Sequence, residues 1–331
     1  MPTEYWVSHI AEDEFVPGNL LFADGSALKT TDGTTTSLIT GSSTSYGFID
    51  GVGSNAKFNH NLSFVLQSRS NVIVADYHNH CLRSVDRLTN QTSTYSGNCT
   101  NRGYQDGVDA LFTFPYSIIL DYMNSQQLII SEHSSHPLKT INVVNKNVIT
   151  MFRYSAYDLT YLLQDPETGN IYVTFNHGVG FYVYQSDTFS VITGSAIQGF
   201  SDGEFSQLKF RHLRGLAFLS RTILLVADVV NNRLRVLDLT TNTSSSICSG
   251  VRGHSDGDVS SCQFDQPWSL FKGDDTVYVG EFKYIRYIQY SKYSTAQHVA
   301  RDHTGCAIFF IMIFTLSSYL ENTFTLQVEN K

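Results

Sequence analysis

The sequence predicts an all-β fold, and the main evidence is a recurring distance between an aromatic residue and the end of a short apolar run. Four aromatic residues stand 18 positions before the last residue of such a run; the pairs are Phe58 with Asp76, Phe114 with Glu132, Tyr157 with Phe175, and Phe210 with Asp228. Phe264 and Glu281 repeat the pattern with one residue fewer, and an Asp-Gly pair lies eight residues before four of the aromatics, at 50–51, 106–107, 202–203 and 256–257. A period of about 50 residues, filled with short apolar runs and turns, is typical of a propeller of four-stranded blades.

Four strand-like runs follow one another within each period. After Phe58 they cover residues 62–67, 72–75, 82–86 and 92–96, and later repeats give the same series at 216–219, 223–227, 234–238, 243–248 and at 268–271, 276–280, 285–290, 295–299. The runs are rich in β-branched and aromatic residues, and connections of a few residues require antiparallel neighbours. No stretch shows a sustained helical period.

One apolar run, Leu20–Asp24, has no aromatic-led inner strand of its own. Its inner strand is either Tyr5–Ile10, which gives six self-contained blades, or a C-terminal segment around Phe310–Leu316 that closes the ring and removes a free edge. We therefore expect a six-bladed propeller over residues 1–303 and a tail over 304–331 that could supply a closing strand. Membrane insertion of Cys306–Leu316 is disfavoured, since 11 apolar residues fall short of the ~18–20 that a spanning helix needs.

A basic residue follows most of the acidic ones at a fixed distance. It lies seven residues on in Asp76/Arg83, Glu132/Lys139 and Asp228/Arg235, and five residues on in Glu281/Arg286 and Asp24/Lys29. In the fourth repeat both charges are absent together, and Phe175 and Tyr182 take their places. Since burying one unpaired charge costs several kcal/mol, this joint loss predicts structural acid–base pairs.

The motifs around the acidic residues resemble a known family. Asn79-His80-Cys81-Leu82 and Asn231-Asn232-Arg233-Leu234 follow two of the acids, and the run Gly47–Phe58 precedes Val74-Ala75-Asp76. Together they resemble the NHL-repeat family of six-bladed β-propellers, in its extracellular type, over about residues 18–300. The third repeat departs from the pattern after Glu132, and the fourth has no Asp-Gly loop.

Composition restricts the partners and the compartment. Charged residues make up 16% of the chain and the formal net charge is −8, with no basic run, so nucleic acid is excluded as a partner. Low charge and abundant Ser, Thr and Asn favour an extracellular or cell-surface protein, either a monomeric propeller or part of a larger chain. No secretory signal is visible at the N-terminus, so a cytoplasmic scaffold is the alternative.

Two of the five cysteines bracket one long loop. A disulfide between Cys248 and Cys262 would staple this loop in an oxidising compartment. The alternative is a free buried thiol at Cys262, which aligns with the column formed by Ala56, Phe112 and Leu208.

Histidines and Asp-Gly pairs are the residues that could hold a metal. His78, His80, His133, His136 and His177 all follow the second strand of consecutive repeats, and some NHL-like propellers, by the resemblance, are zinc- or calcium-dependent lyases. Histidine is an ordinary occupant of this turn in the family, no Cys/His spacing indicates zinc, and Asp-Gly is a common tight turn. We predict no metal and no other cofactor.

No local catalytic motif is present: the chain lacks a G-x-S-x-G elbow, a phosphate loop and H-E-x-x-H. Propellers present a broad, rigid face with variable loops. We therefore predict a non-catalytic binding or scaffold module for a protein or glycan partner; the alternative is a metal-dependent lyase or hydrolase with its site in the axial channel. The Asp-Gly loops and the His/Asn turns should share one face, with the candidate contact residues His78, Arg102, Tyr104, Phe200, Arg252 and His254.

Overall fold

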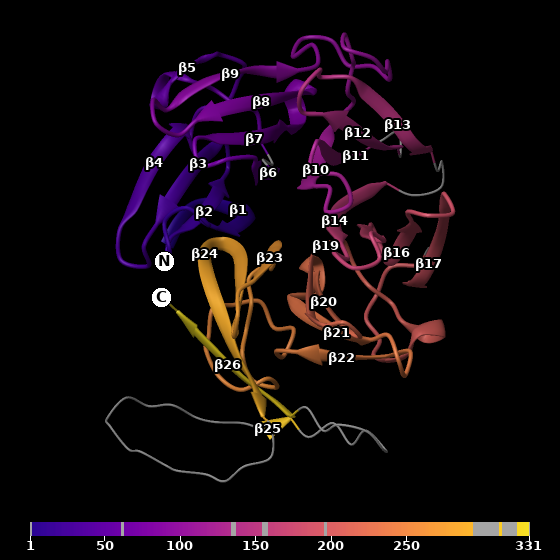
Figure 1. Ribbon diagram of the computed structural model, residues 1–331. Helices are drawn as coiled ribbons and strands as arrows, with labels where there is room; N and C mark the ends of the chain where they lie inside the picture. Colours follow the sequence, from indigo (N-terminus) through magenta and orange to yellow (C-terminus); the bar gives the residue numbers. More distant parts are fainter. Residues whose placement is uncertain are drawn as a thin grey trace.

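The fold is a β-propeller, as the sequence predicts. The computed structural model describes residues 2–60, 63–133, 137–153, 158–194, 197–293, 311–312 and 323–330. Strands are arranged in radial sheets around one axis (Figure 1), and the helical elements of these residues are single 3-10 turns, η1 (Gly53–Asn55), η2 (Tyr77–Asn79), η3 (Phe205–Gln207) and η4 (Val229–Asn231). No helix in the described part of the chain is long and apolar enough to span a bilayer.

Four sheets form one blade each, with strands in sequence order from the axis outward. Two of them gain a short fifth strand from the preceding Asp-Gly loop, which pairs with the outermost strand of the blade. The first of these two contains β5 (Gly51–Val52), β6 (Ser63–Leu66), β7 (Asn71–Asp76), β8 (Cys81–Asp86) and β9 (Gln91–Ser96). The other contains β18 (Gly203–Glu204), β19 (Leu213–Ser220), β20 (Ile223–Asp228), β21 (Arg233–Asp238) and β22 (Thr243–Ile247).

The two four-stranded sheets lie between them in the sequence. One contains β10 (Pro115–Leu120), β11 (Gln127–Glu132), β12 (Pro137–Asn142) and β13 (Val148–Arg153). The other contains β14 (Leu159–Gln164), β15 (Ile171–Phe175), β16 (Gly178–Val183) and β17 (Thr188–Gly194). The observed strands match the predicted meander, with bounds that differ by a few residues.

The two ends of the chain merge into one eight-stranded sheet, so the described residues form five hydrogen-bonded sheets. This corrects the prediction of six separate blades. The sheet holds β1 (Pro2–Glu12), β2 (Leu20–Asp24), β3 (Ala27–Thr31), β4 (Thr36–Gly41), β23 (Ser269–Lys272), β24 (Thr276–Tyr293), β25 (Ile311–Met312) and β26 (Thr323–Asn330). The physical reason is the length of β1, which pairs with β2 along one part and places Trp6 opposite Phe282 of β24 along another.

The long strand β24 reverses its direction. Glu281 and Arg286 form an ion pair of 3.6 Å, although five residues of straight strand would separate them by about 16 Å and place them on opposite faces. Lys283, between them, has φ of 69°, and Figure 1 shows the ribbon of β24 bending back. β24 therefore provides two antiparallel segments, one paired with β23 and the other with β26.

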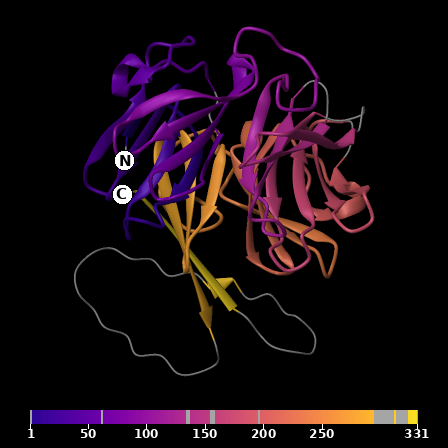
Figure 2. The same ribbon diagram turned by 45° about the horizontal axis from the view of Figure 1, so that its top comes forward.

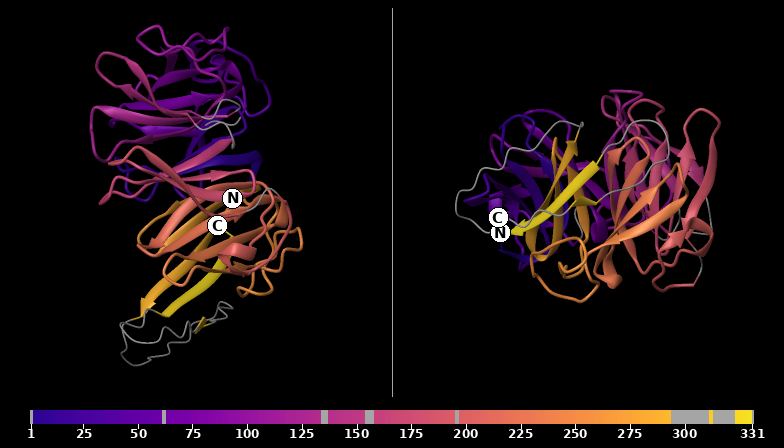
Figure 3. Two further views of the ribbon diagram at one scale, coloured as in Figure 1. Left: turned by 90° about the vertical axis from the view of Figure 1, so that its right-hand side faces the viewer. Right: turned by 90° about the horizontal axis from the view of Figure 1, so that it is seen from below.

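Six innermost strands nevertheless form a closed ring. β1, β6, β10, β14, β19 and β23 contact one another in this order, and β23 returns to β1 (Figures 1 and 2). The expected inner strand Tyr5–Ile10 lies within β1. The tail instead adds β26 along β24, which brings the two termini close together (Figure 3). The expected strands at 295–299 and 310–316 lie outside the described residues, except for Ile311 and Met312 of β25, and so does most of the segment weighed for the membrane.

Aromatic residues fill the seams between neighbouring sheets. Phe58, Phe112, Phe210 and Phe264 are fully buried there. Phe112, and not the predicted Phe114, occupies the aromatic position of the third repeat. Phe114 instead has φ of 54°, like the residues two positions beyond the other three aromatics, His60, His212 and Gln266. Two additional residues between this aromatic and Glu132 shift the register, and Tyr157 lies outside the described residues.

Candidate binding face

The ends of the Asp-Gly loops lie on one face with the turns after the second strands, whereas the Asp-Gly pairs themselves run beside the outermost strands, with Gly51 opposite Thr92 and Gly203 opposite Ser244. The turn residue His78 donates its backbone N–H to Asn59 O at 3.2 Å, and Val229 donates to His212 O at 3.3 Å. Phe282 of the β24 reversal donates to Asp265 O at 3.1 Å. We call this surface the loop face. It comprises turns 77–80, 229–232 and 282–284 and the loops 42–60, 98–114, 197–212 and 249–266, except for the segments 51–55, 107–109 and 203–207, which lie beside the outermost strands.

A buried basic side chain ties each Asp-Gly loop of the loop face to its sheet. Arg83 contacts Asp76 at 2.9 Å and also Asp50 of the Asp-Gly pair at 2.5 Å. Its guanidinium donates to two backbone carbonyls of the loop and lies 5.1 Å from the centre of the Phe58 ring. One cation therefore holds the strand end, the loop and the aromatic of the seam together.

The same arrangement recurs around the ring. Arg235 contacts Asp228 at 2.9 Å and Asp202 at 2.8 Å, and Arg286 contacts Glu281 at 3.6 Å and Asp256 at 2.6 Å. The predicted pairs Lys139–Glu132 and Lys29–Asp24 lie at 3.5 and 2.7 Å. The buried side chains of Phe175 and Tyr182 stand where the fourth repeat lacks the pair. The second carboxylate, from the Asp-Gly pair, is a partner that the sequence reasoning missed.

Burial governs the protonation of these acids. It raises the pKa of Asp76 to about 6 and that of Glu132 to about 7, while the neighbouring Arg83 and Lys139 act in the opposite direction. Burial also raises the pKa of Asp228 and of Glu281. All four carboxylates are completely shielded from solvent, so they are placed to hold the fold and not to meet a ligand.

The predicted contact residues are spread around the loop face. His78, in the turn after β7, and Arg102 and Tyr104, in the loop after β9, are exposed. The His78 ring lies 5.7 Å from the Phe114 ring. Phe200 is 45% exposed, and its ring covers the guanidinium of Arg235 at 5.1 Å. Phe200 thus combines an exposed surface with a role over a buried ion pair.

Two further predicted contact residues are bound to carboxylates. Arg252 contacts Asp265 at 2.6 Å. His254 places Nδ1 3.1 Å from Glu281 and its ring 4.3 Å from the Tyr284 ring. The six residues therefore do not form one cluster, although all of them lie on the loop face.

Exposed apolar side chains gather in the Asp-Gly loops, which sequence reasoning did not foresee. The Asp-Gly loops make up about a fifth of the chain but hold half of the large apolar side chains that are exposed among the described residues. They are Tyr46, Phe48, Ile49, Val52, Tyr104, Val108, Ile197, Phe200 and Val251. Val52, which is paired with Gln91, and Val108, which follows Gly107 opposite Val148, lie toward the far ends of the strands.

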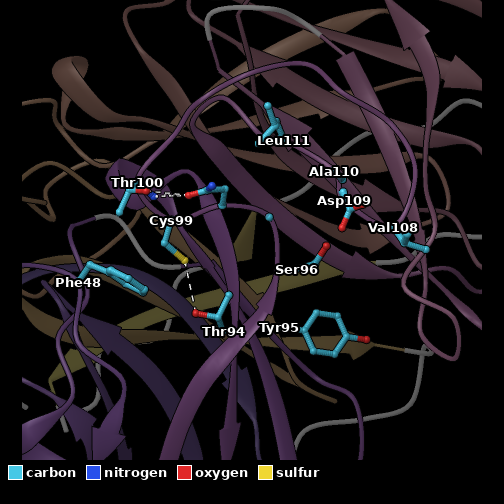
Figure 4. A pocket seen from close by; sticks show the side chains of 12 residues that line it. Phe48, Thr94, Tyr95, Ser96, Cys99, Thr100, Val108, Asp109, Ala110 and Leu111 are labelled. Atoms are coloured by element: carbon cyan, nitrogen blue, oxygen red, sulfur yellow. Dashed lines mark hydrogen bonds between the residues drawn. The ribbon is translucent and has the colours of Figure 1, made fainter.

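A hollow of about 590 Å³ lies between residues 94–100 and residues 108–111, with Phe48 at its side (Figure 4). Phe48 and Tyr95 provide aromatic walls, and hydroxyl, amide and carboxylate groups line the remainder. Asn98 Oδ1 accepts hydrogen bonds from N and Oγ1 of Thr100, at 3.0 and 2.8 Å, which orders one rim. Such a lining suits polar or aromatic side chains of a partner.

Two disulfides fasten the loop face. Cys248 is bonded to Cys262, the pair expected from the sequence, and Cys81 is bonded to Cys99, which sequence reasoning did not pair. Both bonds join the end of a blade to the loop that leaves it. The sequence did not indicate the Cys81–Cys99 pair, because these two cysteines flank two strands of one blade and do not bracket a single loop.

Aromatic side chains fill the axial end of the loop face. Tyr77, Tyr116 and Tyr161 form a buried cluster on which Trp268 packs. The Arg214 guanidinium lies 5.4 Å from the Tyr116 ring and 5.2 Å from the Trp268 ring. Burial raises the pKa of the Tyr116 and Tyr161 hydroxyls and that of Tyr77 to about 12, so all three are protonated at neutral pH.

The histidines of the turns contact aromatic rings and each other. The His133 ring lies within hydrogen-bond distance of the Tyr77 hydroxyl at 3.1 Å, and the His177 and His212 rings are 5.4 Å apart. Burial lowers the pKa of His78 and of His80. Within the described residues no three His, Cys, Asp or Glu side chains are grouped to hold a metal ion, and His136 lies outside them.

Partial sequence similarity links the chain to known proteins. No family model matches it. Protein Suppressor of Quenching 1, chloroplastic, from Arabidopsis thaliana is 23% identical over 261 residues, which are 70% of this chain and 24% of that protein. NHL repeat-containing protein 2 is 30% identical over 106 residues in Bos taurus (31% of this chain, 14% of the relative) and 28% identical over 116 residues in Homo sapiens (33% and 15%). The chain thus spans less than a quarter of the length of these relatives.

Solved structures share the architecture. An auxiliary nutrient binding protein from Bacteroides ovatus superposes with a TM-score of 0.62 at 10% identity, covering 83% of this chain and 67% of that one. A chain of a nidogen/laminin complex superposes with a TM-score of 0.57 at 11% identity, covering 82% and 89%. At such identities the likeness shows the fold alone. The chain is a β-propeller with partial homology to the NHL repeat-containing proteins.

Proposed function

We propose that the chain is a non-catalytic binding module that presents its loop face to a protein partner, in an extracellular or cell-surface setting. The observation that carries this proposal is the concentration of exposed aromatic and aliphatic side chains in the Asp-Gly loops. Aromatic residues and arginine are enriched at protein interfaces, and both occur on this face, for example Tyr104 and Arg102.

The loops that carry these side chains are held rigidly. Arg83, Arg235 and Arg286 each join a loop to its sheet through two carboxylates, and two disulfides tie further loop ends. A rigid surface loses little conformational entropy on binding. The disulfides also support an oxidising compartment. A propeller of the same fold is described as a nutrient binding protein, which is consistent with a binding role.

The test is capture of binding partners by matched variants. Tyr104→Ser removes an exposed aromatic ring from one Asp-Gly loop, and Leu88→Ser removes an exposed side chain from a hairpin at the opposite ends of the strands. We expect partners retained from an extracellular fraction to fall at least tenfold with the first variant and to be unchanged with the second. Equal retention by the first variant would contradict the proposal.

Two measurements separate this proposal from its alternatives. Binding to a glycan array by the wild type, lost in Tyr104→Ser, would identify a glycan as the partner of the same face. One tightly held zinc or calcium per purified chain, lost on changing His80, would favour a metal-dependent lyase or hydrolase.

A further inference from the structure

Among the described residues, four side chains join neighbouring blades at the same place in the fold. Each is the last residue of the turn before the third strand of its blade, and each accepts a hydrogen bond from a backbone N–H of the loop that enters the next blade. The acceptors Ser26, His80, His177 and Asn232 bind the N–H groups of His60, Phe114, His212 and Gln266, at 2.9, 3.1, 3.5 and 3.1 Å respectively. The four donor residues have φ between 54° and 59° and stand two positions after the buried aromatic of a seam. We call these contacts the inter-blade hydrogen bonds.

The acceptors of the inter-blade hydrogen bonds differ in their response to acid. A serine hydroxyl and an asparagine carboxamide accept at any pH between 5 and 8, whereas a ring nitrogen of histidine accepts only when it carries no proton. The backbone N–H of Phe114 can only donate, so its 3.1 Å contact requires that Nδ1 of His80 be unprotonated. Asn232 makes the same contact to Gln266 at the same distance. The bond therefore does not need a histidine, but at His80 it is made by one.

His80 stands where both ends of one loop are fastened. Cys81, the next residue, is bonded to Cys99, which anchors the start of loop 98–114. His80 holds the end of the same loop at Phe114, and the two rings lie 4.4 Å apart in an edge-to-face arrangement. Protonation of His80 would leave the start of the loop fixed and remove the acceptor from its end.

The groups that face His80 are basic, and they favour its neutral form. Burial lowers the pKa of His80, and Arg102 of the loop and His78 of the same turn lower it further. The His60 ring, from the preceding loop, lies 5.9 Å from the His78 ring. A proton on His80 would therefore add positive charge to a surface that is already basic.

Linkage gives the direction of the pH effect. When the loop end is released, the imidazole of His80 is exposed to water and titrates near the ordinary histidine pKa of about 6.5. In the closed form its pKa is lower, so the closed form binds the proton less tightly than the open form. Acid therefore shifts the equilibrium toward the open form, beginning as the pH falls below about 6.5.

We propose that His80 is a pH switch that holds the end of loop 98–114 at neutral pH and releases it in acid. In the imidazolium, Nδ1–H faces the N–H of Phe114, and the new charge faces Arg102. The released loop carries Tyr104, so partner binding by the loop face should weaken in acid; this consequence rests on the proposed function, whereas the switch itself does not.

Amide hydrogen exchange, resolved to single residues by mass spectrometry, tests the switch without a binding partner. Rates measured at about pH 7.5 and about pH 5.5 are converted to protection factors, which removes the intrinsic dependence of exchange on pH. In the wild type we expect the protection of the Phe114 N–H to fall at least fivefold more than that of the Gln266 N–H. In His80→Asn, which introduces the acceptor that Asn232 provides in the other blade, this difference should disappear.

Gln266 is a matched internal control, because a buried carboxylate lies beside both contacts. The residue before each donor gives its own N–H to Glu132 or to Glu281, at 2.7 Å in both cases. Burial raises the pKa of both glutamates, to about 7 for Glu132, so acid acts on both segments in the same sense. The reverse variant, Asn232→His, should make the protection of Gln266 fall in acid.

Two results would overturn the proposal. One is an equal fall in protection at Phe114 and Gln266 in the wild type. The other is a difference between them that persists in His80→Asn. Circular dichroism verifies that His80→Asn is folded; if it is not, Asn232→His retains the test, and unchanged protection of Gln266 in that variant would equally refute the switch. Because no partner takes part, these outcomes leave the proposed binding function untouched.

Discussion

Removal of the Asp228 carboxylate should destabilise the protein by about 2–4 kcal/mol. Asp228 accepts hydrogen bonds at 2.9 Å from Arg235 Nη1, from Asn231 Nδ2 and from the backbone N–H of Arg211. In Asp228→Ala each of these three donors loses this acceptor. Arg235 keeps Asp202 at 2.8 Å, a side chain that is 34% exposed, so its charge is not fully stranded. The cost therefore stays below that of a wholly isolated buried charge.

A double-mutant cycle isolates the contact between the two side chains. Asp228→Ala, Arg235→Ala and the double variant are compared by urea unfolding, followed by near-ultraviolet circular dichroism. We expect a coupling free energy of about 1–3 kcal/mol, because each single variant leaves the other side chain of the pair buried without it, whereas the double variant removes both. The corresponding cycle for Asp202 and Arg235 should give less than about 1 kcal/mol, since Asp202 is partly solvated.

The two cycles can refute the reasoning. Additive effects for Asp228 and Arg235, with coupling below about 0.5 kcal/mol, would show that the pair does not act as a buried tie. A larger coupling for Asp202 than for Asp228 would show that the Asp-Gly carboxylate, and not the strand-end acid, neutralises the guanidinium.

Three further perturbations have defined outcomes. Burial lowers the pKa of His9 to about 4, so the unfolded chain binds this proton at a higher pH than the folded chain. The free energy of unfolding should fall by up to about 3 kcal/mol as the pH drops from 6.5 to 4. In His9→Gln the melting temperature should depend less on pH over this range than in the wild type. Cys99→Ser removes a disulfide whose cysteines are 18 residues apart, and it should lower the free energy of unfolding by about 3 kcal/mol in denaturant titrations without reductant. Compared with the reduced wild type, the variant should show no loss. Gly215→Ala places a Cβ 2.7 Å from Leu270 N at the contact of two inner strands and should lower the free energy of unfolding by about 2 kcal/mol in chemical denaturation. In the control Gly273→Ala the nearest atom is 3.5 Å from the added Cβ, and the loss should be less than about 0.5 kcal/mol. Equal losses would contradict the close packing of the ring.

The architecture could be predicted because the acid–base pairs that stabilise it recur at fixed distances in the sequence. Acid and base lie five or seven residues apart on adjacent strands, so their pairing follows from local distance. The register of the third repeat could not be obtained in this way. Phe112 and Phe114 are both aromatic, and the spacing to Asp106 and Glu132 favours Phe114. The structure identifies Phe112 as the buried one, and its ring lies 5.1 Å from Lys139 Nζ.

The binding face was predicted in position but not in detail. Asp202 and Arg235 are 33 residues apart, and no local pattern shows that the aspartate of an Asp-Gly turn reaches a buried guanidinium. Phe200 and His254 were selected as contact residues, and the structure also places them beside Arg235 and Glu281. Exposure of apolar side chains depends on how the loops cross the sheets, so it could not be deduced from the sequence.

Site-specific photo-cross-linking tests the central claim, that the loop face is the binding surface. A photoreactive phenylalanine analogue replaces Tyr104 on the loop face or, in a matched protein, Leu88 on a hairpin at the opposite ends of the strands. Both side chains are exposed, so the two positions differ in the face that they report. We predict covalent adducts with a native partner from position 104 and none from position 88; adducts from position 88 alone would contradict the assignment of the loop face.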